Sequence, residues 1–373
     1  MATGPRTRIL VVDDSAVMRS LLRTIICSDT SLEFAGAAMD GESALSLIAA
    51  TRPDLVLLDV EMPVMDGLAT LRAMRARNLR LPVVMCSSLT QRGAAVTVEA
   101  LAAGASDYVT KPARQANLAQ ATQTLAQDLL PKIHALTARR SAQPALLPLA
   151  RHAEPPVLSP GTSPAGSFSP SLVVIGVSTG GPAALDAILP RLPARFPLPV
   201  LIVQHMPEMF TRLLAERLDR LCKLRVVEAS EGQAVAPGTV VIARGNWHME
   251  VVPRSAQEPA LHLLQTPPEN HCRPAVDVLF RSAAAVYGSG VLGLVLTGMG
   301  SDGLEGARVI AHRGGCILAQ DEASSAVWGM PGAVTRAGLA QRVVPLDLVA
   351  AELIRIAGRP SRETALLHEA KAC

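Results

Sequence analysis

Residues 172 to 182 read LVVIGVSTGGP, and this stretch decides the fold class of the C-terminal half of the chain. Its apolar residues predict a buried strand, and the small residues after them predict a sharp turn. Pro182 suits the first turn of a helix, where its missing N–H costs nothing. A strand that turns into a helix is the unit of an α/β protein, and it places the Ser178 hydroxyl at the carboxyl edge of a parallel sheet. Such proteins keep a nucleophile at that edge.

The composition indicates a two-domain protein of ordinary charge. The chain has 373 residues, 49% of them hydrophobic, with a formal net charge of +3 and only 2% aromatic residues. This charge is too small to indicate a nucleic-acid partner, and so few aromatic residues argue against base stacking.

The N-terminus does not resemble a signal peptide, and no apolar run approaches the ~18 residues of a membrane span. The six cysteines are widely spaced, which is typical of reduced thiols. We therefore expect a cytoplasmic monomer with no membrane insertion and no nucleic-acid partner.

Strand and helix patterns alternate in both halves, which predicts doubly wound parallel α/β sheets. We expect four segments: a domain over 6–130 of the flavodoxin-like (βα)5 kind, a proline-rich linker over 131–170, a second α/β domain over 171–358, and a polar tail over 359–373. The second sheet is expected to be mostly parallel. The first domain is predicted to have strands at 9–12, 32–39, 55–58, 83–86 and 108–110, and helices at 16–27, 41–50, 67–76, 93–103 and 114–130.

Carboxylates follow two predicted strands of the first domain. Asp13 and Asp14 end the first strand, Asp59 ends the third, and Lys111 follows the fifth. Because the carboxyl ends of parallel strands meet at one edge, we expect these side chains to converge. Crowded carboxylates favour a hard divalent cation, and Lys111 adds a positive charge. The first two aspartates could instead cap a helix.

With Ser87 after the fourth strand, this set resembles the receiver domain of two-component response regulators. The resemblance covers residues 6–128. It implies that Asp59 accepts a phosphoryl group from a histidine kinase of the chemotaxis type and that Mg²⁺ is required, with Asp13, Asp14 and Asp59 as its ligands. It also implies that Ser87 and Tyr108 change position in response.

The C-terminal half offers a nucleophile, a base and a carboxylate. Gly176-Val-Ser-Thr-Gly180 fits G-x-S-x-G, although a degraded dinucleotide-binding loop is an alternative. That loop needs an acidic residue after the next strand, and His205 stands there instead. Asp302 follows another apolar strand, 292–296, or caps the helix after it. Ser178, His205 and Asp302 are therefore predicted to form a catalytic triad, in an order that differs from that of the α/β-hydrolases.

Other residues compete for these roles or complete them. His248, His262, His271 and His312 are alternative bases, but none follows a strand at the expected edge. His271 and Cys272 are adjacent, which is weak evidence for a metal site. The backbone amides of Thr179 and Met299 are our candidates for the oxyanion hole.

Residues 171–357 resemble the catalytic domain of the chemotaxis protein-glutamate methylesterases, through the strings GVSTGGP, QHMP, HCRPAVDVLF and LTGMGSDG. The resemblance implies hydrolysis of glutamate methyl esters and deamidation of certain glutamines on the cytoplasmic helices of methyl-accepting chemoreceptors. It also implies that the receiver covers the active site until Asp59 is phosphorylated. We expect no cofactor for ester hydrolysis itself. The segment 243–248 departs from the proline-glycine turn of that family. Two alternatives remain: a receiver joined to a non-catalytic binding domain, and a receiver joined to a nucleotide-binding regulator.

Overall fold

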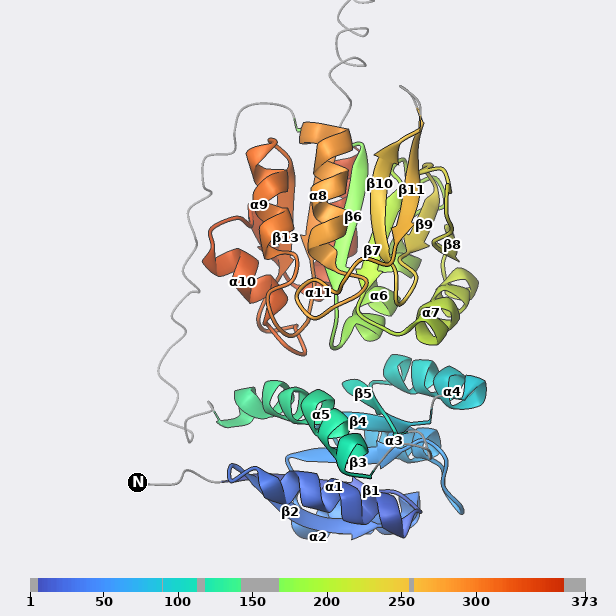
Figure 1. Cartoon of the computed structure of the whole chain (residues 1–373), viewed down its shortest axis with the longest axis vertical. Coiled ribbons are helices and arrows are strands. Elements are labelled where there is room, and N and C mark those ends of the chain that lie inside the picture. The colour runs from blue at the N-terminus through green and yellow to red at the C-terminus, as the bar shows by residue number, and fades with distance from the viewer. Residues whose placement is uncertain (1–5, 89, 113–117, 142–167, 255–257, 359–373) are drawn as a thin grey trace, which may run out of the picture. The chain divides into compact units, whose positions relative to one another are not determined.

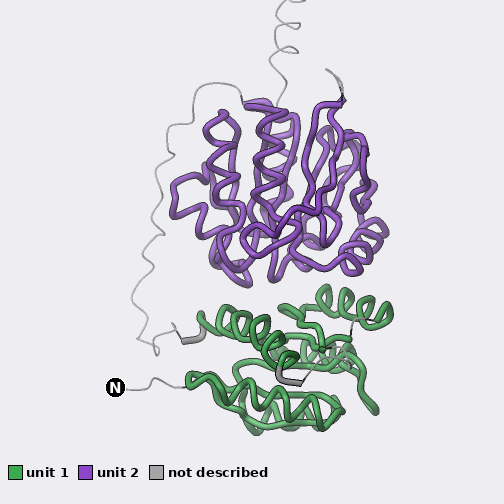
Figure 2. Tube along the Cα trace, in the orientation of Figure 1, with its two compact units in different colours: residues 1–143 green, residues 144–373 purple. Residues whose placement is uncertain are grey.

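The computed structural model divides into two compact units, residues 1–143 and 144–373, which are described separately here (Figure 2). The structure describes residues 6–88, 90–112, 118–141, 168–254 and 258–358. Most of the predicted linker and the whole predicted tail lie outside these residues.

The first unit is a five-stranded parallel sheet in the order β2-β1-β3-β4-β5, which confirms the flavodoxin-like fold. The central strands are buried on both faces, because helices cover both sides of the sheet (Figure 1). Its strands are β1 (Thr7–Val12), β2 (Leu32–Ala38), β3 (Leu55–Asp59), β4 (Val83–Ser87) and β5 (Asp107–Thr110). Its helices are α1 (Ala16–Ser28), α2 (Gly41–Thr51), α3 (Gly67–Ala76), α4 (Gln91–Ala102) and α5 (Leu118–Ser141).

The last helix of this unit corrects the predicted start of the linker. Helix α5 runs to Ser141, so residues 131–141 belong to it, although Pro131 lies inside it. A proline inside a helix costs about 3 kcal/mol. The apolar face of α5 offsets this cost, because Leu129 before the proline and Ile133 and Leu136 after it are all buried. The predicted start of the helix at residue 114 lies outside the described residues.

The second unit is built on a seven-stranded parallel sheet in the order β14-β13-β12-β6-β7-β9-β8. Its strands are β6 (Leu172–Val177), β7 (Val200–Gln204), β8 (Arg225–Glu228), β9 (Thr239–Ile242), β12 (Val291–Val295), β13 (Cys316–Gln320) and β14 (Arg342–Val344). Its helices are α6 (Gly181–Ile188), η1 (Leu189–Arg191), α7 (Glu208–Leu221), α8 (Val276–Tyr287), η2 (Gly288–Gly290), α9 (Leu304–His312), α10 (Met330–Arg336) and α11 (Leu346–Ala357). The first strand of the unit, β6, lies between β7 and β12 near the middle of the sheet. The loops after these three strands therefore share one edge.

A separate antiparallel hairpin, β10 (His248–Pro253) and β11 (Pro259–Leu264), packs against helix α8. Its inward side chains, among them Met249, Val251 and Leu261, join the core that α8 covers. The hairpin leads into the loop 265–275, which carries several residues of the site described below.

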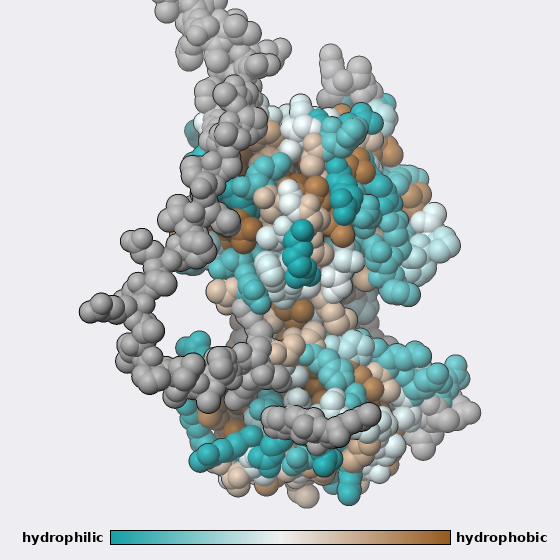
Figure 3. Space-filling view, turned by 90° about the vertical axis from the view of Figure 1, so that its left-hand side faces the viewer, coloured by the Kyte–Doolittle hydropathy of each residue, from teal (hydrophilic) through white to brown (hydrophobic). Residues whose placement is uncertain are grey.

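On the face seen in Figure 3, hydrophilic and hydrophobic residues are interspersed over each of the two units. Among the described residues, no helix combines the length and the apolar character that crossing a membrane requires.

Candidate functional site

Ser178 lies in a tight turn between β6 and α6. Its amide donates to the carbonyl of Thr297 at 3.0 Å, and its carbonyl accepts from the amide of Gly181 at 2.8 Å. Gly180 in this turn has a φ of +78°, which favours glycine. The side-chain amide of Gln204, at the end of β7, also donates to the Ser178 carbonyl at 3.1 Å. The serine is thus held from the ends of the two strands that flank β6.

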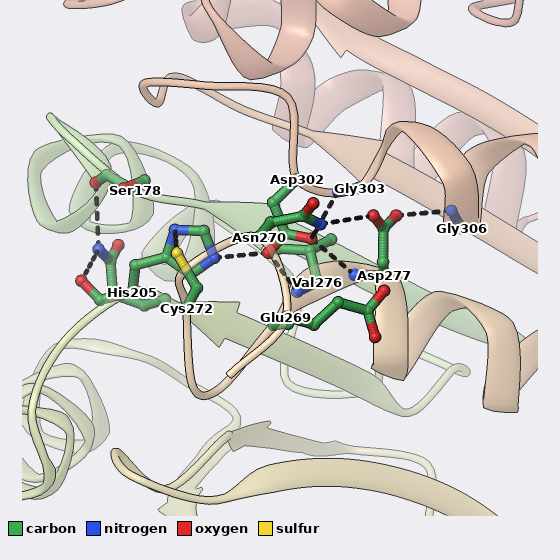
Figure 4. A network of polar contacts seen from close by, with 12 residues as sticks. Ser178, His205, Glu269, Asn270, Cys272, Val276, Asp277, Asp302, Gly303 and Gly306 are labelled. Carbon is green, nitrogen blue, oxygen red and sulfur yellow. Dashed lines mark hydrogen bonds and ion pairs between the residues drawn. The ribbon is translucent and has the colours of Figure 1, made fainter. Parts of the chain in front are cut away.

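His205 and Asp302 meet at the same edge, although 97 residues separate them (Figure 4). His205 follows β7, and Asp302 lies in the glycine-rich loop after β12. The Nε2 atom of His205 lies 2.8 Å from Oδ2 of Asp302. Since the carboxylate accepts the Nε2 proton, Nδ1 is the ring nitrogen left with a lone pair.

Asp302 is buried and surrounded by hydrogen-bond donors. Besides His205, its two oxygens accept the amides of Val276, Asp277 and Gly303 at 2.7, 3.0 and 2.9 Å. Burial alone would raise the pKa of Asp302, but the hydrogen bond and charge of His205, followed by these amides, lower it below its ordinary value. Val276 and Asp277 begin α8, so Asp302 caps α8; helix α9 has Gly303 as its N-cap and no side-chain cap. An ionised carboxylate is favoured there by the helix dipole as well.

A two-residue turn supplies a further donor to Asp302. Asn270 and His271 both have positive φ, 52° and 62°, and Glu269 and Cys272 on either side exchange two backbone hydrogen bonds. This geometry is that of a tight hairpin turn. Its consequence is that Nδ2 of Asn270 donates to Asp302 at 3.0 Å.

Asp277 supports that turn from helix α8. Its carboxylate accepts from Nδ2 of Asn270 at 2.9 Å and from the amide of Gly306 at 2.6 Å. Burial raises the pKa of Asp277 to about 6. Sequence reasoning assigned no role to Asn270 or Asp277, although both lie in or beside the string HCRPAVDVLF.

The same turn brings Cys272 to the other side of the His205 ring. The Sγ atom of Cys272 lies 3.5 Å from Nδ1 of His205 (Figure 4). Burial lowers the pKa of His205, but the hydrogen bonds to Asp302 and Cys272 outweigh it and raise the value to about 9. Sequence reasoning noted this cysteine only as a neighbour of His271, and His271 itself is exposed.

Within the described residues, the Ser178 hydroxyl makes no hydrogen bond to the His205 ring. In ligand-free enzymes such contacts are often long and shorten only when substrate binds. The oxyanion candidates differ in setting. Thr179 is buried and its carbonyl accepts from the Thr297 hydroxyl at 2.9 Å, whereas Met299 is 38% exposed.

The competing histidines have other partners. His248 is buried, with Nδ1 accepting the amide of Ala275 and Nε2 facing the carbonyl of Pro267. His262 lies at the surface, 3.0 Å from Glu231. Neither His248 nor His262 contacts Ser178, and His312 ends helix α9.

The first unit gathers its charged residues at the carboxyl edge of its own sheet. Nζ of Lys111 lies 2.7 Å from Oδ2 of Asp13 and 2.7 Å from Oδ2 of Asp59. Carboxylate oxygens of Asp13, Asp14 and Asp59 lie within 4.8 Å of one another. Ser15, not an aspartate, caps the helix that follows, and Asp13 accepts the amide of Ser15. This oxygen-rich cluster fits a hard cation such as Mg²⁺.

Asp59 is almost fully buried, and its pKa is raised to about 6. Burial is the main cause; Lys111 opposes it and the charge of Asp13 adds to it. Ser87 is buried at the end of β4, where its hydroxyl donates to the carbonyl of Ser88 at 3.1 Å. Tyr108 is buried in β5, and Nζ of Lys132 lies 5.3 Å from the centre of its ring. The charged residues predicted for this site and Ser87 thus lie at the carboxyl edge of the sheet, and Tyr108 lies within β5.

Comparisons with known proteins agree for both units. Residues 173–353 match the CheB methylesterase family, and residues 9–123 match the response regulator receiver domain. A protein-glutamate methylesterase/protein-glutamine glutaminase of a Nocardioides species is 50% identical over 353 residues, covering 94% of this chain and 95% of that one. The protein of the same name from Trichodesmium erythraeum is 45% identical, covering 95% of this chain and 100% of its own. The crystal structure of the Thermotoga maritima CheB methylesterase catalytic domain is 42% identical, with a TM-score of 0.49, and covers 50% of this chain and 99% of that one.

Proposed function

The chain belongs to the protein-glutamate methylesterase/protein-glutamine glutaminase family with a receiver domain, and from that premise we propose that Ser178, His205 and Asp302 carry out the hydrolysis. The observation that carries the proposal is the 2.8 Å contact between His205 and Asp302 beside the Ser178 turn. We further propose that the substrates are glutamate methyl esters and certain glutamine side chains on chemoreceptors.

In the proposed mechanism, Nδ1 of His205 takes the proton of Ser178 while the serine oxygen attacks the ester carbonyl. Asp302 holds Nε2 and stabilises the imidazolium. The proton then passes to the leaving methoxide, so methanol departs and an acyl-serine remains. Water attacks this ester, His205 again accepts and returns the proton, and the glutamate carboxylate is released. On glutamine the leaving group is ammonia.

The amides of Thr179 and Met299 remain our proposed donors to the oxyanion. Thr179 follows the serine at the start of α6, where amides point outward from a helix N-terminus. Support for Met299 comes from the rigidity of its loop, because the carbonyl of the preceding Gly298 accepts the amides of both Gly329 and Met330.

We propose that phosphorylation of Asp59 by a histidine kinase increases this activity. Asp13, Asp14 and Asp59 would hold Mg²⁺, which would supply positive charge to offset that of the phosphoryl group. Lys111 provides a second positive charge at the same carboxylates. A phosphoryl group adds about −1.5 to −2 charge at neutral pH, enough to rearrange Ser87 and Tyr108 nearby.

The test of the catalytic proposal is the replacement Ser178→Ala. Methanol release from methylated receptor should fall by a factor on the order of 10⁶, as when other serine nucleophiles are removed. Ser301→Ala is the matched control, because Ser301 lies exposed at the same sheet edge and should leave the rate unchanged. If Ser178→Ala folded normally and kept a tenth of the wild-type rate, the serine mechanism would be wrong.

A further inference from the structure

His205 and Cys272 face each other across a distance typical of two ligands of one metal ion. A tetrahedral Zn²⁺ with Zn–S of about 2.3 Å and Zn–N of about 2.05 Å holds its sulfur and nitrogen ligands roughly 3.5 to 3.6 Å apart. The Sγ–Nδ1 distance here is 3.5 Å. The two donor atoms therefore already lie at the separation that a shared ion requires.

Asp302, the third member of this cluster, gives His205 the carboxylate partner that zinc-bound histidines usually have. His205, Cys272 and Asp302 place their ligand atoms within 4.8 Å of one another, one of two such groups among the described residues. Asp302 holds Nε2 of His205, which is the nitrogen opposite the thiol. Histidine ligands of zinc usually donate their other ring nitrogen to a carboxylate in this way, which orients the ring and raises its basicity.

The cysteine is held firmly in place. The turn that carries it is closed by the backbone hydrogen bonds between Glu269 and Cys272, at 2.8 and 3.0 Å. Arg281 of α8 binds the Glu269 carboxylate with two hydrogen bonds of 2.6 and 2.7 Å. A ligand pair fixed before binding loses little conformational freedom when the metal arrives.

We propose that His205 and Cys272 form an inhibitory site for a thiophilic divalent cation such as Zn²⁺. Thiolate and imidazole ligands select such metals over Mg²⁺, which prefers oxygen. The ion takes the Nδ1 lone pair, and hydrolysis stops because that lone pair accepts the proton of Ser178. The inhibition depends on the proposed function, in which His205 is the base. The coordination of the metal by His205 and Cys272 does not depend on it.

The experiment uses the full chain with excess Mg²⁺, so that the receiver carboxylates are occupied. Cd²⁺ is titrated as a spectroscopic substitute for Zn²⁺, and the near-ultraviolet absorbance of the Cd–thiolate bond is recorded. In parallel, methanol release is measured against Zn²⁺ concentration, relative to the metal-free rate of each variant. We expect one strong Cd²⁺ site and reversible loss of hydrolysis, restored by a chelator.

Cys272→Ala should abolish this absorbance. It should also raise the Zn²⁺ concentration for half-inhibition by more than about 100-fold, because loss of a mere outer partner already costs 10- to 100-fold in affinity. Cys222→Ala is the matched control: Cys222 is also partly buried in the second unit but lies beside Asp186 and Asp219, not beside a histidine. That variant should behave like the wild type.

Two results would overturn the proposal. The first is Cd²⁺ absorbance and Zn²⁺ inhibition that persist in Cys272→Ala. The second is Cd²⁺ bound at Cys272 with hydrolysis unaffected, which would remove the inhibition and count against His205 as the base. Loss of the absorbance in His205→Ala, a binding measurement that needs no activity, would support the coordination independently of the proposed catalysis.

Discussion

Asp59 and Asp302 occupy equivalent places in the two units but have opposite surroundings. Asp59 ends β3 and Asp302 lies in the loop after β12; each is almost fully buried, and each contacts a nitrogen of Lys111 or His205. The pKa of Asp59 is raised to about 6, mainly by burial, whereas the pKa of Asp302 is lowered.

The difference lies in the number of backbone donors. Asp302 accepts three amides and the Asn270 side chain in addition to His205. Asp59 accepts one amide, that of Glu61, at a long 3.5 Å. A carboxylate with every lone pair engaged is suited to orienting another group. A carboxylate with free lone pairs is suited to reacting itself. Local hydrogen-bond donors, not position in the sheet, therefore separate the two proposed roles.

Between these two carboxylates, the larger effect is expected from removing the charge on Asp302. Asp302→Asn should lower kcat for methanol release by roughly 10⁴, the scale seen when a triad aspartate becomes an amide and the histidine tautomer is wrong. Asp59→Asn, the same change at the reacting carboxylate, is the control and should leave the unphosphorylated rate unchanged. Equal losses in both variants would contradict the separate roles proposed for Asp302 and Asp59.

Activation by phosphorylation is expected to require the phosphoacceptor and the metal ligands of the first unit. With a small phosphodonor, Asp59→Asn should show no activation, and a chelator should have the same effect on the wild type by removing Mg²⁺.

A fragment starting near Ser169 should hydrolyse receptor esters about 5- to 150-fold faster than the unphosphorylated full chain, the range of ordinary allosteric coupling. Methanol release with and without chelator provides the measurement. A chelator that stopped the fragment would indicate a catalytic metal and remove the triad assignment.

A smaller effect is expected from loosening one donor to Asp302. Asn270→Gly keeps the positive φ but removes the amide that bridges Asp302 and Asp277. A hydrogen bond to a charged group contributes about 1.5–3 kcal/mol, so kcat should fall by roughly 10- to 100-fold. Asn246→Gly is the matched control, because Asn246 also has positive φ (65°) but binds Arg273 instead. If both variants kept full activity, the bridge would have no part in orienting Asp302.

The smallest expected effect is a shift in pH dependence. A base works only when deprotonated, so hydrolysis should rise with pH through the pKa of His205, which is about 9. The hydrogen bond to Cys272 is one of the contacts that raise this pKa. Cys272→Ala should therefore move the rising limb of kcat/KM toward neutral pH, measured in metal-free buffer. An unchanged or more alkaline limb would contradict this account.

Much of the scaffold could be predicted from the sequence, because buried parallel strands are short apolar runs. The run at 172–175, for example, lies inside β6, and the polar residues after such runs do meet at one edge. The full length of helix α5 was harder to predict. Pro131 normally ends a helix, and the burial of the apolar face that stabilises α5 beyond it depends on the tertiary structure.

The neighbours of Asp302 and His205 could not be predicted, because they depend on the turn at Asn270 and His271. Asn and His tolerate positive φ better than most residues, but neither is the glycine that usually marks such a turn. That turn decides that Asn270 points to Asp302 and that Cys272 faces His205. Which ring nitrogen of His205 contacts Asp302 and which contacts Cys272 could not be predicted from the strand ends either.

The central place of β6 in its sheet has a consequence for how the enzyme matures. Ser178 and His205 follow the first two strands of the unit to be synthesised, but Asp302 follows β12, about a hundred residues after His205. Contacts of such sequence separation form late, since a long loop must close before they do. A nascent or partly folded chain thus carries an unoriented histidine and an idle serine. With the proposed triad, hydrolytic activity therefore requires β6, β7 and β12 to have assembled.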